Sequence, residues 1–118
     1  MVLESHKDPV VTDPDCYRVI FENERVRVLS YDDTPGACTA PHAHPDSVMV
    51  TLSSFRRRVS SGGRAVEVDL PAHAVRWVGA QEHTGENIGP TETHCVFVEL
   101  KEPSAGPVEG HAPLGPSL

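Results

Sequence analysis

Apolar and polar residues alternate over short stretches along most of the chain. Val26 and Val28 alternate with Arg25 and Arg27, and this period of two predicts a half-buried β-strand. Further segments that favour strands cover residues 47–59, 64–70, 71–78 and 94–100. No stretch of the sequence has a helical period of useful length. The pattern predicts about seven short strands in an all-β barrel or sandwich.

Turn signals separate these segments and divide the chain. Gly62 and Gly63, in the stretch SSGGR, predict a hairpin turn. The stretch GAQEHTGENIGPTET, residues 79–93, is polar and glycine-rich, which predicts a connection between strands. Both ends of the chain carry prolines and no clear period. We expect an N-terminal arm or edge strand, one barrel domain, and a flexible tail rich in proline and glycine, over residues 1–14, 15–101 and 102–118.

Composition narrows the class of protein. The chain has 118 residues with eleven prolines and nine glycines, which fits one domain of short strands and turns. Its net charge of −7 excludes a general nucleic-acid binder. The three cysteines are widely spaced and form no CxxC motif, so we expect reduced thiols. With no signal peptide and no apolar run of membrane-spanning length, we expect a cytoplasmic protein without a membrane partner.

Two histidines one residue apart stand just ahead of an apolar run. Side chains at i and i+2 of a strand point to the same face, so His42 and His44 would be aimed at one place. His83 follows one complete hairpin later, which is enough chain to return antiparallel beside the first pair. Three buried imidazoles without partners would be costly, and one divalent transition metal offsets that cost. Imidazole suits Fe(II), Zn, Ni, Cu and, less strongly, Mn.

The histidines lie in two segments that resemble a known pair of motifs. The segment GACTAPHAHPDSVMV resembles the first motif of the cupin superfamily, and WVGAQEHTGENIG resembles the second. Over about residues 15–101 the chain is similar to a small single-domain cupin of the cupin-2 type. The resemblance implies a conical β-barrel of two antiparallel sheets, a jelly roll or double-stranded β-helix, with a metal bound inside. It also implies the metal ligands His42, His44 and His83.

The family pattern adds a glutamate ligand, and here the chain departs from the pattern. The glutamate would fall at Val48 or Met49, and neither is a carboxylate. Gln81 is a candidate fourth ligand through its amide oxygen if its segment is extended, and His94 is an alternative candidate. Water can also fill an open position. Two acids beside His83 are candidates to orient an imidazole: Glu82 and Glu86.

The walls of the expected substrate pocket follow from strand parity. Val48 has the same parity as His42 and His44, so its side chain is expected to face the metal. The expected pocket residues are Val48, Val50, Trp77, Arg56 and Arg58. The arginines have two interpretations. Either one of them pairs with a substrate carboxylate at the barrel mouth, or both lie in solvent on the outer face.

These features favour a metal-dependent enzyme that acts on a small organic substrate. Similarity to cupins with three-histidine sites implies a dioxygenase, in which a redox metal binds oxygen and an enolate-like or thiol substrate. A non-redox cyclase, isomerase or lyase with a Lewis-acid metal is the second hypothesis. A non-catalytic protein that binds or senses a small molecule is the third. The resemblance also implies a homodimer, because cupins commonly dimerise.

Overall fold

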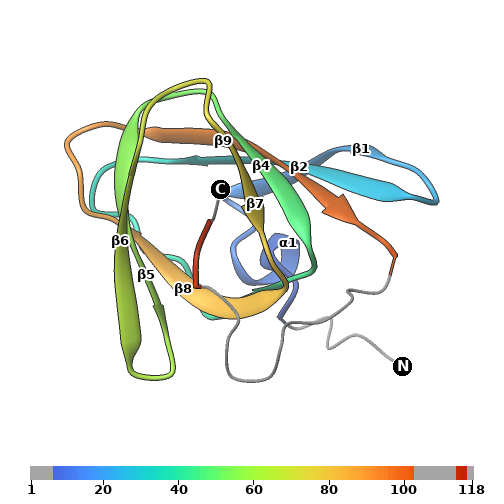
Figure 1. Ribbon diagram of the computed structural model, residues 1–118, viewed down its shortest axis with the longest axis horizontal. Coiled ribbons are helices and arrows are strands. Elements are labelled where there is room, and N and C mark those ends of the chain that lie inside the picture. Colours follow the sequence, from blue (N-terminus) through green and yellow to red (C-terminus); the bar gives the residue numbers. More distant parts are fainter. Residues whose placement is uncertain (1–6, 103–113, 117–118) are drawn as a thin grey trace.

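The computed structural model describes residues 7–102 and 114–116 (Figure 1). The described residues form nine strands in two antiparallel sheets. The first sheet has the order β1-β2-β9-β4-β7 and consists of β1 (Tyr17–Glu22), β2 (Val26–Asp33), β9 (Thr93–Leu100), β4 (Ser47–Thr51) and β7 (Val75–Val78). The second has the order β3-β8-β5-β6 and consists of β3 (His42–His44), β8 (Gln81–Asn87), β5 (Phe55–Ser61) and β6 (Arg64–Leu70).

The two sheets face each other and form a barrel around one core (Figure 1). Successive side chains of a strand point to opposite faces, so every second residue of β9 is buried, from Thr93 to Glu99. The core is built from both sheets: Tyr17, Leu29, Tyr31, Met49, Phe55, Leu70, Val78, Cys95 and Phe97. Burying one side chain of the size of Leu29 contributes about 1.5–3 kcal/mol. The predicted all-β barrel is confirmed.

The N-terminal part of the described chain forms a short helix where an arm or an edge strand was expected. Helix α1 (Pro9–Thr12) begins after Asp8, whose carboxylate accepts a hydrogen bond from the Val10 amide at 3.0 Å. Pro9 suits the first helical position because its ring fixes φ and it has no amide hydrogen to leave unpaired. No helix among the described residues is long and apolar enough to cross a membrane.

Strand β8 corrects the prediction that residues 79–93 form only a connection. The segment from Gln81 to Asn87 pairs with β3 on one side and with β5 on the other. Its sequence, QEHTGEN, lacks the apolar alternation of a strand because its inward residues face a polar site rather than the apolar core. The expected antiparallel return is confirmed, since His42 is directly opposite His83.

Part of the C-terminal tail lies in the mouth of the barrel (Figure 1). Gly115 is buried and its amide donates a hydrogen bond to Gln81 Oε1 at 2.8 Å. A Cβ atom at Gly115 would lie 3.6 Å from Val66 Cγ2 and 3.7 Å from Val68 Cγ2. The expected flexibility of the rest of the tail concerns residues 103–113 and 117–118, which lie outside the described residues.

Candidate metal centre

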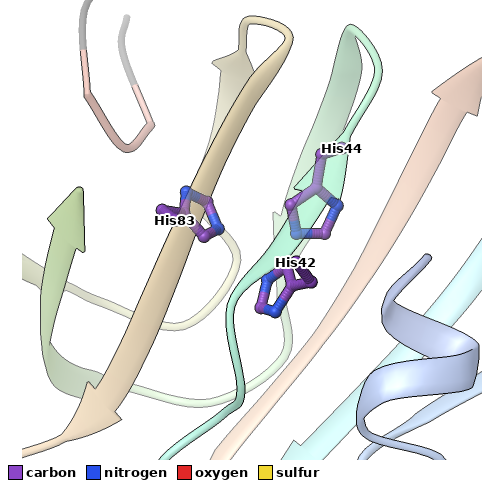
Figure 2. A group of neighbouring side chains, drawn as sticks. All are labelled: His42, His44 and His83. Atoms are coloured by element: carbon purple, nitrogen blue, oxygen red, sulfur yellow. The ribbon is translucent and has the colours of Figure 1, made fainter. Parts of the chain in front are cut away.

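Three histidine side chains converge inside the barrel (Figure 2). His42 and His44 come from the same face of β3, and His83 comes from the neighbouring strand β8. One ring nitrogen from each lies within 4.8 Å of the others. His42 is 1% exposed and His44 is 4% exposed, while His83 is half-buried. The i, i+2 spacing and the cross-strand pairing therefore place three imidazoles at one point, as the sequence predicts.

The Nδ1 atoms of these histidines face acceptors on their outer side. His42 Nδ1 donates to the Ala40 carbonyl at 2.9 Å. His83 Nδ1 donates to Gln81 Oε1 at 2.7 Å. His44 Nδ1 lies 3.5 Å from the Glu99 carboxylate. At His42 and His83 the oxygen acceptor fixes the hydrogen on Nδ1 and leaves the Nε2 lone pair free, which is the arrangement that supports imidazole as a metal ligand.

The donor set fits a divalent transition metal. Burial, reinforced by His44, lowers the pKa of His42 to about 4. Burial, together with His44 and His42, lowers the pKa of His83 to about 2. Both rings are therefore neutral near pH 7, and a metal ligand must be neutral imidazole. His44 Nδ1 and Glu99 Oε2 lie 3.5 Å apart, and both are buried without a hydrogen-bond partner among the described residues.

A cavity of about 60 Å³ adjoins the histidines. Its wall is mostly apolar and includes Met49, Phe55, Val59, Val68, Val78, Cys95 and Phe97. Polar groups enter the wall from Tyr17, Tyr31, Thr39, Arg57 and Thr93, and the tail residues Gly115 and Pro116 close one side. A site of this size holds on the order of four water molecules.

Known proteins of this shape identify the fold. No protein-family model and no curated protein matches the chain. A cupin domain from Bordetella pertussis has a similar structure, with a TM-score of 0.67 and 28% identity over 72% of this chain and 91% of that one. This chain folds as a small cupin domain.

Two further structures share the cupin fold with it. A conserved protein with a double-stranded β-helix domain from Klebsiella pneumoniae matches 86% of this chain and 83% of its own, with 21% identity and a TM-score of 0.58. A predicted oxalate decarboxylase from Thermotoga maritima matches 71% of this chain and 78% of its own, with 17% identity and a TM-score of 0.51. At these identities the likeness concerns the fold alone.

The two residues expected to complete the ligand set have other positions in this cupin. Gln81 Oε1 accepts hydrogen bonds from His83 Nδ1 and from the Gly115 amide, so Gln81 orients a ligand instead of acting as one. His94 faces outward on β9, between Asp32 at 2.6 Å and Glu92 at 2.8 Å. Its hydrogen bonds to these acids raise the pKa of His94. The structure corrects both expectations.

The acids expected to orient an imidazole also face away from the candidate metal centre. Glu82 pairs with Lys7 at 2.7 Å and Glu86 with Arg58 at 3.1 Å. Both alternate with His83 along β8, so their side chains point to the other face. The acid beside the site is Glu99, which sequence reasoning missed. The sequence contains a signal for its inward position, because Glu99 has the same parity as the other buried residues of β9.

None of the expected pocket residues lines the cavity, and for Val48 and Val50 the reason is a change of parity between β3 and β4. The link from His44 to Ser47 contains two residues, so the inward positions shift from even to odd numbers. Met49 is 5% exposed and lines the cavity, whereas Val48 pairs with Trp77 on the other face. Val50 shares the parity of Val48, and Trp77 is 39% exposed.

The arginine inside the cupin is Arg57, and the expected Arg56 and Arg58 bind Glu67 on the outside. Arg57 Nη1 donates to Asp33 at 2.5 Å and to Thr93 Oγ1 at 3.1 Å. Burial alone would raise the pKa of Asp33, but hydrogen bonds from Tyr31 and Arg57 hold it below the usual value. Both partners of the ion pair are satisfied within the wall, and removing either one would leave the other charge buried and unpaired. Phe55 and Val59 share the parity of Arg57 and are buried, so the apolar pattern of β5 indicates that Arg57 points inward.

Proposed function

We propose that this cupin is a metal-dependent enzyme that acts on a small organic substrate, with dioxygenase chemistry at a redox metal. The observation that carries the proposal is the set of three imidazoles that converge at one point, with Nδ1 of each facing an oxygen acceptor and away from the others. His42, His44 and His83 would hold the metal. A redox-active ion in such a site supplies the activation of oxygen that the organic substrate alone lacks.

The remaining residues of the site support a small anionic substrate. Neutral ligands leave the full charge of a divalent ion in the cavity, and this charge favours an anionic oxygen donor such as an enolate. Met49 and Phe97 supply an apolar wall, which excludes water and strengthens that attraction. The volume of the cavity limits the substrate to a few heavy atoms.

Metal analysis of untagged protein purified without oxygen tests the first part of the proposal. We expect one equivalent of a divalent transition metal in the native protein. His42→Ala together with His44→Ala should abolish it in a folded protein, because two of the three ligands are gone. His94→Ala is the matched control and should keep the metal, since His94 lies on the outer face. Stoichiometric metal in the double variant would overturn the assignment.

Oxygen uptake tests the reaction class. We expect uptake by the iron-loaded protein with small 1,3-dicarbonyl or thiol substrates and none in the His42→Ala, His44→Ala protein. Turnover of such substrates with a bound metal and no oxygen uptake would replace the dioxygenase by a Lewis-acid enzyme, the second hypothesis from the sequence. A protein without metal would leave the binding or sensing hypothesis.

A further inference from the structure

A phenol group points at the metal centre from the opposite sheet. Tyr17 lies on β1 and is buried. Its hydroxyl oxygen lies 3.5 Å from His42 Nε2 and 3.4 Å from His44 Nε2. These are the nitrogens whose lone pairs face the metal position, because the outer nitrogens face oxygen acceptors. Tyr17 is therefore placed within reach of any ligand that the metal binds.

Metal binding changes what the Tyr17 hydroxyl can bond to. Among the described residues, the two Nε2 lone pairs are the acceptors within reach of the Tyr17 hydroxyl when no metal is bound, at distances longer than a normal hydrogen bond. A metal held by His42 and His44 uses both lone pairs, so neither can then accept from the phenol. A buried donor without an acceptor is destabilising. A metal-bound ligand that carries an acceptor atom removes this cost.

We propose that Tyr17 donates a hydrogen bond to an anionic oxygen of the substrate bound at the metal, and so selects oxyanion ligands over ligands without a free acceptor. This inference rests on the proposed function, because it requires the metal held by the three histidines. The apolar side chains around the site strengthen a hydrogen bond to a charged oxygen. Tyr17 is thus a specificity-determining residue, and the substrate class is a small carboxylate or enolate.

The test compares two probes on the Co(II)-loaded protein, read from the visible spectrum of the metal. Acetate keeps an acceptor oxygen after it binds, whereas 1-methylimidazole uses its lone pair on the metal and offers no acceptor. In Tyr17→Phe, the affinity for acetate should fall by about ten- to a hundredfold, the loss of one hydrogen bond to a charged acceptor. The affinities for Co(II) and for 1-methylimidazole should stay within about threefold, the usual context-dependent scatter of such effects.

Tyr31→Phe is the matched control. Tyr31 packs against Tyr17 with ring centroids 4.6 Å apart, but its hydroxyl bonds to Asp33 and to Arg57. This variant should keep the ratio of the two affinities. A Tyr17→Phe protein with an unchanged ratio would overturn the inference while metal binding, and with it the proposed function, stands. Loss of Co(II) from Tyr17→Phe would make Tyr17 a ligand and overturn it too. Absence of metal from the wild type would overturn both.

Discussion

Met49 is the residue that stands where the cupin pattern places a glutamate ligand. Its side chain lines the cavity together with His42 and His83, and the neighbouring Val48 faces the other side of the sheet. A thioether in this place would leave a bound metal with neutral protein ligands, and it bounds an apolar pocket. One inward position on β4 thus determines both the charge of the site and the shape of its wall.

Substituting Met49→Glu should add an anionic ligand to the site. We expect Mn(II) to bind more tightly by roughly tenfold or more, because a carboxylate suits this hard ion better than a thioether does. Acetate should bind the loaded variant more weakly, since the new carboxylate competes for the same charge. Calorimetric titration measures both affinities. Val48→Glu is the matched control on the outward face, and an equal effect from that variant would show that the register is wrong.

Strand β8 shows how a strand with a polar sequence can occupy an interior position in a sheet of the barrel. Its inward residues are Gln81, His83, Gly85 and Asn87, and each serves a polar contact or a close approach. Asn87 donates to Asp33 at 3.0 Å, and Gly85 leaves room for the guanidinium of Arg57. The strand is stabilised by its ladders to β3 and β5 rather than by apolar burial.

Gly85→Ala tests this close approach. A Cβ atom at Gly85 would lie 2.8 Å from Arg57 Nη2, and Arg57 is fixed by its bonds to Asp33 and Thr93. We expect the free energy of unfolding to fall by about 1–3 kcal/mol, the usual effect of overpacking. A Cβ atom at Gly79 would lie 3.8 Å from its nearest neighbour, Trp77 Nε1. Gly79→Ala should therefore change the free energy of unfolding by less than about 0.5 kcal/mol. If Gly85→Ala and the wild type have equal free energies of unfolding in urea, the Arg57 side chain moves aside without cost.

The sequence predicts the strands that alternate and the histidines that meet, but not the register of every strand. The i, i+2 spacing of His42 and His44 is local, and the structure confirms the common face. Pro45 and Asp46, between β3 and β4, shift the inward positions from even to odd numbers. The alternation within each strand carries no information about this shift. The inward direction of Arg57 follows from its parity with Phe55 and Val59, but its partner Asp33 lies on a distant strand, and no local pattern contains that partner.

At the scale of the whole molecule, the described tail residues 114–116 connect the barrel mouth to the candidate metal centre. Gln81 Oε1 accepts hydrogen bonds from the Gly115 amide and from His83 Nδ1. One oxygen therefore links the tail to the imidazole of a candidate metal ligand. The homodimer expected from the family resemblance stays a prediction, which sedimentation velocity tests. The cytoplasmic location stays a prediction as well, which fractionation of cells tests.

Truncation after residue 113 should open the mouth with little effect on stability. The Gly115 hydrogen bond contributes about 1 kcal/mol, and ordering the tail costs a similar amount of chain entropy, so we expect the melting temperature to stay within a few degrees. Release of the metal to a chelator should become faster, because the cavity wall loses Gly115 and Pro116. Gly115→Ala should act in the same direction, because the φ of +75° strains an alanine there. An unchanged release rate would show that the tail does not limit access.

The wall of the cavity contains two oxidisable side chains that would be modified by oxygen chemistry at a bound metal. Met49 and Cys95 are both oxidisable and buried, and burial raises the pKa of Cys95 to about 12, so its thiol is inert to reagents in bulk solvent. Cys38 is exposed and meets such reagents first. After long aerobic incubation, iron-loaded protein should carry added oxygen on Met49 ahead of Cys38, and zinc-loaded protein should not. Peptide mass spectrometry measures the oxidation of each residue. Oxidation confined to Cys38 in both the iron-loaded and the zinc-loaded protein would contradict oxygen chemistry inside the barrel.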